Sequence, residues 1–330
     1  MESLEFDSCI LYLGTRDGFR VARLTPSGLE IIARGVRDNA VRGIAVDPSN
    51  PAAAYVGCGL RGWGLYRTTD AGRTIEDLGF EDRWVWDVAQ HPSNPETVYV
   101  GTEPPMVYVS VDDGDTFDEI TSIEELPSRS KWTFFHEPFY EGHIHGFAIH
   151  PARPERIFAG VEHGALIYTH DGGETWHDAL VGHDLHRIAV DPAGPDRVLA
   201  ATGSGLFHSH DAGESWASTP ALRGKYLHSI IFDADAPRYA YAYADQEGSP
   251  LYKSEDSGDS WHAIGEGLPT AKPADNLRLH PEDPTTLIYV GDANEKESSV
   301  YLSTSSGETW HRIDTALPKV WRVEVAPDDI

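Results

Sequence analysis

Short apolar runs with alternating polar residues recur along the whole chain, and their length and spacing predict β-strands. In one clear example, Ile44, Ala45 and Val46 lead into a turn at Asp47, and a second apolar run begins at Tyr55. The same order of strand, Pro-containing turn after Asp or His, and strand recurs at residues 88–95, 147–154, 188–195, 230–237 and 277–284. No long amphipathic helix interrupts the pattern, so we expect an all-β protein.

A second repeat, S/T-x-D-x-G-x-S/T-aromatic, lies between these strand pairs. Its six copies begin at Thr68, Ser110, Thr169, Ser209, Ser254 and Ser303, so successive starts lie 42, 59, 40, 45 and 49 residues apart. The Asp suits a hairpin corner because its carboxylate accepts backbone N–H groups of its own turn, and the Gly takes a positive φ. The aromatic residue is expected to fill the gap to the next unit. We therefore interpret these aspartates as structural, including the weaker sixth copy with Ser305 in place of Asp.

The number of repeats predicts a seven-bladed β-propeller with four antiparallel strands per blade. Six strand pairs are complete, and the seventh copy, residues 323–327, stops at the end of the chain. Residues 10–14, 19–23 and 29–32 supply the three missing strands. One blade is therefore split between residues 8–34 and 320–327, which closes the ring and removes open sheet edges. We expect residues 1–330 to form a single propeller domain.

These repeats resemble the Asp-box, or BNR-repeat, propellers of the sialidase-like superfamily, over essentially the whole chain. That superfamily includes sialidases, other glycosidases, sorting receptors and photosystem II assembly factors. A sialidase mechanism implies three arginines, a Tyr–Glu pair and an acidic Asp. Candidates for the cations are Arg16, Arg42, Arg61, Arg278 and Arg322, and Tyr226 would pair with Glu162 or Glu103. Because the arginine–isoleucine–proline signature of sialidases is missing, we do not expect true sialidase activity.

The charge balance excludes some partners. The net charge is −27, from 53 acidic and 26 basic residues. Such a surface repels nucleic acid and anionic membranes. An acid-rich composition with few lysines is typical of proteins that work in molar salt, so we expect a halophilic protein, with an acidic mesophilic protein as the alternative.

The chain also carries signals about compartment. Its first residues lack a basic region and an apolar run, and no apolar stretch approaches the length that crosses a bilayer, so neither a signal peptide nor a membrane span is expected. Cys9 and Cys58 should lie at opposite faces of the ring and stay unpaired. These features favour a cytoplasmic protein.

The candidate site lies on the top face, where the loops that enter the innermost strands surround the channel mouth. His145, His186 and His228 occupy matching positions in three consecutive blades, near Glu162 and Tyr226, and these five are the catalytic candidates. The three histidines are also the candidate ligands of a divalent metal, although no cofactor is required. The alternative is that they only pack along the channel. Candidate ligand-binding residues around them are Arg16, Arg42, Arg61, Trp63, Trp84, Trp86, Trp132, His143, His163, Arg278 and Trp321.

The spacing of 59 between the second and third copies of the box indicates an insertion at residues 120–143, expected on the top face. It carries the aromatic residues Trp132, Phe134, Phe135, Phe139 and Tyr140. Such a segment is typical of a lid or a sugar-stacking wall, or of a plug between blades.

The favoured function is a carbohydrate-active protein, glycosidase- or lyase-like, that uses a pocket rich in His, Arg and Trp. The alternative is a non-catalytic propeller that binds a glycan or small ligand or acts as a protein-assembly scaffold. The expected partner is a carbohydrate or another small polar ligand. A protein partner remains an alternative, whereas nucleic acid and membrane are not expected.

Overall fold

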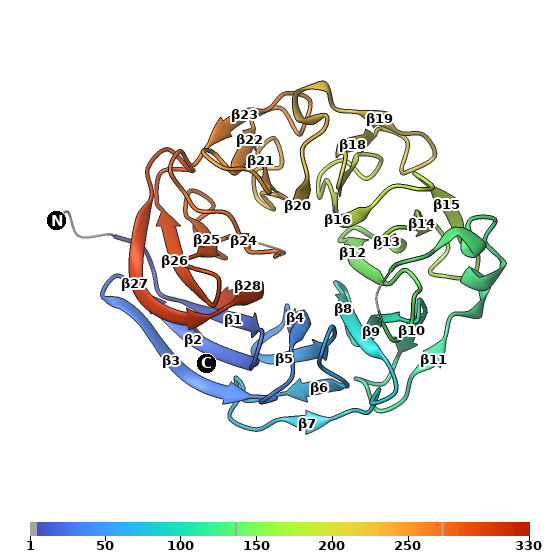
Figure 1. The fold of residues 1–330 in the computed structure, drawn as a ribbon, viewed down its shortest axis with the longest axis horizontal. Coiled ribbons are helices and arrows are strands. Elements are labelled where there is room, and N and C mark those ends of the chain that lie inside the picture. Colours follow the sequence, from blue (N-terminus) through green and yellow to red (C-terminus); the bar gives the residue numbers. More distant parts are fainter. Residues whose placement is uncertain (1–4, 136, 272–273) are drawn as a thin grey trace.

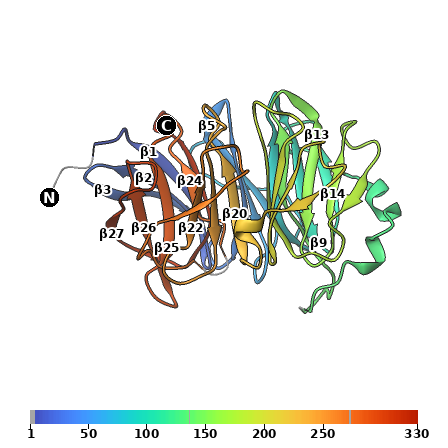
Figure 2. The same ribbon diagram turned by 90° about the horizontal axis from the view of Figure 1, so that it is seen from above.

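The computed structural model describes residues 5–135, 137–271 and 274–330, and within them seven four-stranded sheets form a ring (Figure 1). The sheets are antiparallel, and the ring seen edge-on is a disc (Figure 2). The prediction of a seven-bladed all-β propeller is therefore confirmed. His136 of the insertion and residues 1–4, at the start of the segment in which we expect no signal peptide, lie outside the described residues.

Each blade has an inner strand that faces the channel and three strands that step outward. From inside to outside, the blades are β4 (Val41–Asp47), β5 (Asn50–Cys58), β6 (Leu65–Thr68) and β7 (Glu76–Asp77); β8 (Trp84–His91), β9 (Asn94–Glu103), β10 (Val107–Ser110) and β11 (Asp118–Glu119); β12 (Ile144–His150), β13 (Arg153–Val161), β14 (Leu166–Thr169) and β15 (His177–Ala179). The next are β16 (Leu185–Val190), β17 (Val198–Thr202), β18 (Gly205–Ser209) and β19 (Ala217–Ser218); β20 (Leu227–Phe232), β21 (Ala240–Ala244), β22 (Leu251–Ser254) and β23 (His262–Ile264); β24 (Leu277–Leu279), β25 (Leu287–Asp292), β26 (Glu297–Ser303) and β27 (His311–Pro318).

The seventh blade joins the two ends of the chain, as the repeat count predicted. It consists of β28 (Val320–Pro327), β1 (Cys9–Thr15), β2 (Gly18–Thr25) and β3 (Gly28–Gly35). β28 is the inner strand and pairs antiparallel with β1, with Leu13 opposite Val323 and Ile10 opposite Ala326. This pairing closes the ring by joining the last strand of the chain to the N-terminal strands.

The apolar core lies between neighbouring blades. Side chains that alternate along β1 serve two interfaces: Leu11 and Leu13 pack toward Val290 of the sixth blade, whereas Ile10 packs toward Val56 of the first. Because both faces of each sheet are covered by neighbouring blades, the strands bury apolar side chains on both sides. Each such Leu or Ile contributes about 1.5–3 kcal/mol when fully buried.

The Asp-box corners lie between the third and fourth strands of their blades and build themselves as expected. In the third blade, Asp171 accepts the backbone N–H of Thr175 at 2.9 Å and its hydroxyl at 2.6 Å, while Thr169 donates to the same carboxylate at 2.7 Å. In the sixth blade, Ser305 Oγ replaces the carboxylate and accepts the N–H of Thr309 at 3.0 Å. The aspartates are therefore fully used within their turns.

The aromatic residue of the box packs in the direction opposite to the one predicted. Trp176, in the box of the third blade, joins the cluster that contains Tyr99 and Val107 of the second blade. Likewise, Trp261 of the fifth blade packs against the cluster that includes Leu199 of the fourth. The aromatic side chain of each box therefore fills the gap to the preceding blade.

The insertion begins with two short 3-10 helices, η1 (Thr121–Glu125) and η2 (Arg129–Lys131), at the outer rim between β11 and β15 (Figure 1). Trp132 then turns inward, is only 1% exposed, and packs with Ile123 in the cluster between the second and third blades. Its Nε1 donates to Ser128 Oγ at 2.9 Å. The first half of the insertion is therefore a plug between blades. A third 3-10 helix, η3 (Pro220–Leu222), lies in the connection from β19 of the fourth blade to β20 of the fifth.

Two further features concern the chain as a whole. Cys9 and Cys58 are both buried and free, as expected. Within the described residues, no helix is both long enough and apolar enough to cross a bilayer.

Candidate functional site

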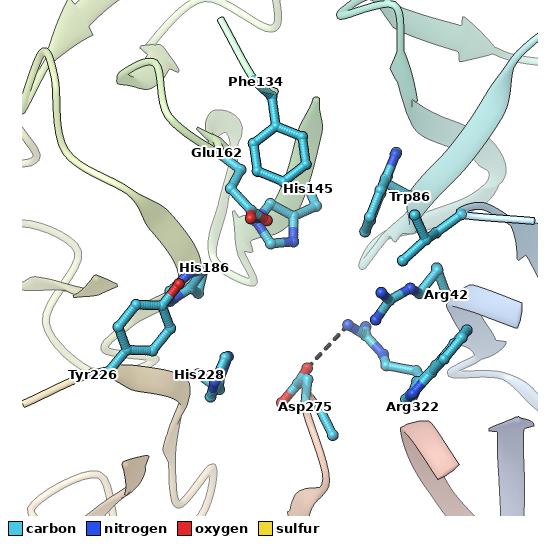
Figure 3. Close-up of a pocket in the computed structure, with 13 residues that line it drawn as sticks. Arg42, Trp86, Phe134, His145, Glu162, His186, Tyr226, His228, Asp275 and Arg322 are labelled. Carbon is cyan, nitrogen blue, oxygen red and sulfur yellow. Dashed lines mark hydrogen bonds and ion pairs between the residues drawn. The ribbon is translucent and has the colours of Figure 1, made fainter. Parts of the chain in front are cut away.

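A cavity of about 200 Å³ lies at the end of the channel where the inner strands begin. Every blade contributes to it, either from its inner strand or from the residues next to that strand (Figure 3). Its lining consists of Arg42, Leu60, Trp86, Phe134, His145, Glu162, His186, Tyr226, His228, Ala274, Asp275, Trp321 and Arg322.

A β-bulge at the same place in five inner strands explains why these side chains reach the cavity. The pairing registers skip one residue in each strand: Arg42, Trp86, His186, His228 and Trp321. A bulge places two residues opposite one and re-aims a side chain. All five skipped residues line the cavity.

In four of these strands, the residue after the bulged one lies further along the channel, below the rings that line the cavity. Asp87, Arg187, Ser229 and Arg322 follow four of the bulged residues, and all four join one polar network below the cavity. The bulges therefore give the site two layers, a wall of rings and guanidinium groups and a floor of ion pairs.

One wall of the cavity is built from Tyr226, His186 and His228 (Figure 3). His186 Nδ1 donates to the carbonyl oxygen of Leu227 at 2.6 Å, and its Nε2 lies 3.3 Å from Asp184 Oδ2. The same carboxylate oxygen accepts the Tyr226 hydroxyl at 2.7 Å. Although burial opposes the charged ring, the hydrogen bond to Asp184 and the charges of Glu162 and Asp184 outweigh it and raise the pKa of His186. His186 is therefore the ring on this wall that favours the imidazolium form.

Two other rings are held neutral. Burial lowers the pKa of His228 to about 3, helped by the neighbouring His186, whose ring centroid is 4.9 Å away. Burial also lowers the pKa of His145 to about 4, with His143 adding to the effect. His145 Nε2 donates to Leu185 O at 2.7 Å, so Nδ1 is the acceptor nitrogen of the neutral ring.

The opposite wall carries indole rings and cations (Figure 3). The Arg42 guanidinium carbon lies 4.9 Å from the Trp86 ring centroid and 4.2 Å from that of Trp321. Burial lowers the pKa of Arg42 to about 10, so the group is still charged at neutral pH. This side of the cavity suits an anionic group on a sugar or acid.

Behind the Trp86 wall lies a buried imidazole between two carboxylates. The His143 ring stacks on Trp86 with centroids 3.6 Å apart, and its Nε2 lies 2.8 Å from Glu162 Oε2. On its other side, Nδ1 lies 3.5 Å from Glu103 Oε2, which also accepts Trp86 Nε1 at 2.9 Å. Burial raises the pKa of Glu103 to about 7. Glu162 thus faces both the cavity and His143.

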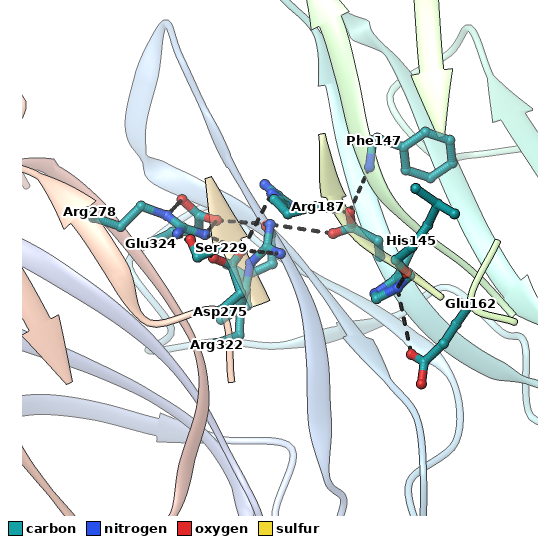
Figure 4. A network of polar contacts seen from close by, with 12 residues as sticks. His145, Phe147, Glu162, Arg187, Ser229, Asp275, Arg278, Arg322 and Glu324 are labelled. Carbon is teal, nitrogen blue, oxygen red and sulfur yellow. Dashed lines mark hydrogen bonds and ion pairs between the residues drawn. The ribbon is translucent and has the colours of Figure 1, made fainter. Parts of the chain in front are cut away.

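The floor is a balanced network of three arginines and three carboxylates from four blades (Figure 4). Arg278 donates to both oxygens of Asp275 at 2.8 Å and to Glu324 at 2.6 and 2.9 Å. Arg187 reaches Asp87 at 3.1 Å. Although burial opposes ionisation, these guanidinium groups hold the pKa of Asp275 well below its usual range. Asp275 is therefore a fixed anion and is unsuited to donate a proton.

The structure gathers many of the predicted site residues around the cavity and places others elsewhere. His145, His186, His228, Glu162, Tyr226, Arg42, Trp86 and Trp321 line it. Predicted residues outside the lining are Arg16, Arg61, Trp63, Trp84, Trp132, His143, His163 and Arg278. Among these, Arg278 lies in the floor network, and Trp132 belongs to the plug. The hydroxyl of Tyr226 donates to Asp184 Oδ2 and so does not form the Tyr–Glu pair that a sialidase mechanism implies.

The predicted metal trio does not converge. Among the described residues, the groups whose three ligand atoms lie within 4.8 Å of one another are His143–His145–Glu162 and Glu162–His163–Asp184. His145, His186 and His228 are not one of them. The physical reason is that His186 uses its nitrogens on Leu227 O and Asp184, while His145 turns Nε2 to Leu185 O.

Sequence reasoning missed the acidic partners Asp184, Asp87 and Asp275. Asp184 lies two residues before His186, so strand alternation already placed both on one side. Asp87 was hidden because the bulge at Trp86 breaks that alternation. A simple period-two reading puts Asp87 on the side opposite to Trp86.

Family comparisons identify the repeat and a propeller-containing family. Residues 167–178 match the model described as BNR/Asp-box repeat, and residues 204–329 match the model described as Sortilin, neurotensin receptor 3. No curated protein matches the sequence. Neither model covers half of the chain, and the structure together with the repeat match shows a β-propeller that carries Asp-box repeats.

Solved structures share the fold at low sequence identity. A GH74 xyloglucanase from Xanthomonas campestris is 16% identical with a TM-score of 0.68, over 91% of this chain and 52% of that chain. A GH74 enzyme from Niastella koreensis is 15% identical with a TM-score of 0.57, over 96% and 58%. The structure of YCF48 bound to D1 peptide is 14% identical with a TM-score of 0.57, over 87% and 93%. The chain therefore spans about half the length of the xyloglucanase. These likenesses show the fold alone.

Proposed function

We propose that this propeller is a carbohydrate-active protein that takes one acidic sugar ring into the mouth cavity and cleaves its glycosidic bond by elimination. The observation that carries the proposal is the pair of facing walls, with His186 and His228 on one side and Arg42 between two indoles on the other. The likeness to GH74 enzymes supports a carbohydrate ligand.

The cavity fits one ring. Its volume of about 200 Å³ is below the range of roughly 300–1,000 Å³ for pockets that hold drug-sized ligands. Trp86 and Trp321 line the cavity and offer apolar surface to the ring, and Arg42 pairs with its carboxylate. A sugar bound in this way is the terminal residue of its chain, with the glycosidic bond at the mouth.

The charge states of the walls support elimination over hydrolysis. Hydrolysis by the usual route needs one protonated carboxyl group and one carboxylate. The two carboxylates that line the cavity are both paired with cationic or imidazole groups: Asp275 with arginines and Glu162 with His143. A neutral imidazole beside an imidazolium instead provides a base and an acid.

The elimination step balances without water or an oxidant. His228 takes the proton from the carbon next to the sugar carboxylate, and the electrons of that C–H bond form a carbon–carbon double bond. The bond from the neighbouring carbon to the leaving oxygen breaks, and that oxygen takes the proton of His186. Arg42 stabilises the negative charge that develops on the carboxylate.

The test is incubation of the protein with oligosaccharides whose reducing-end residue is galacturonate, glucuronate or mannuronate, linked through its 4-oxygen, since each carries a hydrogen on the carbon next to the carboxylate. The expected result is an unsaturated product, detected by its ultraviolet absorbance, with no ¹⁸O taken up from labelled water. His228→Ala should lower the rate at least about 100-fold, in the range of general base catalysis. His177→Ala, on the exposed outer strand β15, is the matched control and should keep the rate.

Each other outcome contradicts the proposed chemistry. Uptake of ¹⁸O with a saturated product would identify a hydrolase. Binding of a sugar with no product would identify a non-catalytic binding protein. Binding of peptides and of none of the sugars would favour the type of ligand seen with YCF48.

A further inference from the structure

His143, His145 and Glu162 bring three metal-binding side chains together on one side of the cavity. The two histidines lie two residues apart at the start of β12, and Glu162 directly follows β13 in the same blade. One ligand atom from each lies within 4.8 Å of the other two. Glu162 Oε2 lies 2.8 Å from His143 Nε2 and 3.6 Å from His145 Nε2. We propose that these three residues bind one divalent transition-metal ion.

The donor set selects the class of metal. Two imidazoles and one carboxylate are the protein ligands of catalytic zinc sites, which keep a fourth position open, and they also suit Mn²⁺ or Fe²⁺. Ca²⁺ and Mg²⁺ prefer oxygen ligands only. Zn²⁺ is therefore the appropriate first probe, with Mg²⁺ as the contrast.

The surroundings of His143 are those of a metal-ligating histidine. Its side chain is fully buried, yet neither ring nitrogen has a hydrogen bond of acceptable geometry among the described residues. Glu162 and Glu103 lie beside the two nitrogens but are poorly aligned for hydrogen bonds, which is unfavourable for a buried ring. A metal at Nε2 and the Glu103 carboxylate beside Nδ1 satisfy both nitrogens, which is the usual carboxylate–histidine–metal arrangement.

The remaining contacts fix the ligands in place. Trp86 covers the face of His143 and donates to Glu103, so the ring and its supporting carboxylate share one anchor. His145 is held by the bond from Nε2 to Leu185 O. The 3.6 Å distance to Glu162 is measured from the same nitrogen, so ligation through Nε2 would replace this bond with a bond to the metal.

The ion would bring a Lewis acid to the cavity. Glu162 and His145 line the cavity, whereas His143 lies behind its wall, so open coordination positions would face a bound ligand. This inference goes beyond the proposed elimination, because metal binding is measured on the protein alone. Failure of either one leaves the other standing.

The experiment is calorimetric titration of chelator-treated protein with Zn²⁺, together with elemental analysis of the dialysed complex. The expected result is one zinc per chain and no binding of Mg²⁺. Glu162→Gln and His143→Ala should each weaken binding at least about 100-fold, and Glu103→Gln about 10–100-fold, as for other outer-shell partners. Cobalt in place of zinc should give visible absorption that His145→Ala changes.

His163→Ala is the matched control because this exposed ring belongs to the neighbouring group Glu162–His163–Asp184. Its affinity should equal that of the unaltered protein. Zinc binding lost in His163→Ala but kept in His143→Ala would overturn the proposal, as would the absence of zinc binding in a protein with normal thermal unfolding. Glu162→Gln keeps shape and size, so the test stands even if His143→Ala fails to fold.

Discussion

Asp275 and Arg322 are paired twice, through their backbones and through their side chains. They form a parallel β-bridge, with the N–H of Asp275 donating to Trp321 O at 3.1 Å and the N–H of Val323 to Asp275 O at 3.3 Å. In addition, Arg322 Nη1 donates to Asp275 Oδ2 at 2.9 Å. The ion pair therefore joins the last strand of the chain to the sixth blade at the floor of the cavity. Ring closure and site construction depend on the same residues.

We predict that Asp275→Asn destabilises the fold by about 3–5 kcal/mol, because it leaves three buried guanidinium groups with only two carboxylates. Chemical denaturation at neutral pH measures the loss. The control is Asp314→Asn on the exposed part of β27, which should change stability by less than about 0.5 kcal/mol. Equal stability of the two variants would show that the network adds nothing.

The unaltered protein and the Asp275→Asn variant should also differ in how their stability changes in acid. The folded-state pKa of Asp275 is depressed, so its contribution is present above its unfolded pKa, near about 3.9, and is lost as pH falls toward the folded value. The unfolded chain then binds a proton that the native state does not. Below about pH 4 the unaltered protein should therefore lose stability more steeply than Asp275→Asn. Parallel curves would contradict this assignment.

The closing strand gives a second prediction. Val323 of β28 is fully buried against the sixth and seventh blades, whereas Val111 is 67% exposed. We predict that Val323→Asp costs about 3–5 kcal/mol through an uncompensated buried charge, and that Val111→Asp costs less than about 0.5 kcal/mol. Thermal and urea unfolding provide the comparison. A small effect at Val323 would show that the ring holds without the β1–β28 pairing.

Much of the fold was predictable because repeats report strand order and number directly. The incomplete seventh copy of the strand-pair repeat, at residues 323–327, was enough to place β28 against β1. The site was only partly predictable. Matching positions identified His145, His186 and His228, but the bulges and the hydrogen bonds to Leu185 O and Leu227 O decide where each ring points. Such local departures from strand geometry leave no periodic trace in the sequence.

The insertion illustrates the same limit. Its aromatic residues indicated a wall or a plug, and the structure divides these roles between neighbours. Trp132 fills the gap between two blades, whereas Phe134 lines the cavity and Phe135 is 97% exposed. Composition identified an aromatic segment, but only tertiary packing assigns each ring its side.

Salt dependence tests the surface charge. With a net charge of −27, repulsion between acidic groups should weaken the fold when salt falls from molar to about 0.1 M, where the Debye length is near 10 Å. We therefore propose a halophilic protein and predict a lower melting temperature in dilute salt. Sodium sulfate and sodium chloride matched for ionic strength separate screening from general salting effects. An equal or higher melting temperature in dilute salt would contradict the prediction.

The last prediction concerns Arg42, which we propose as the anion-binding group of the cavity. Arg42→Lys keeps the charge but loses the planar group that fits between Trp86 and Trp321, and lysine cannot pair with a carboxylate through two parallel bonds. We predict at least about a tenfold loss of affinity for an acidic sugar, equivalent to about 1.4 kcal/mol. Arg61→Lys is the control, since Arg61 is exposed and outside the cavity lining. A neutral sugar of the same shape should lose no affinity in either variant. Calorimetry with both sugars makes the measurement, and an equal loss for the acidic and neutral sugars would mean that Arg42 only supports the stacking of the indoles.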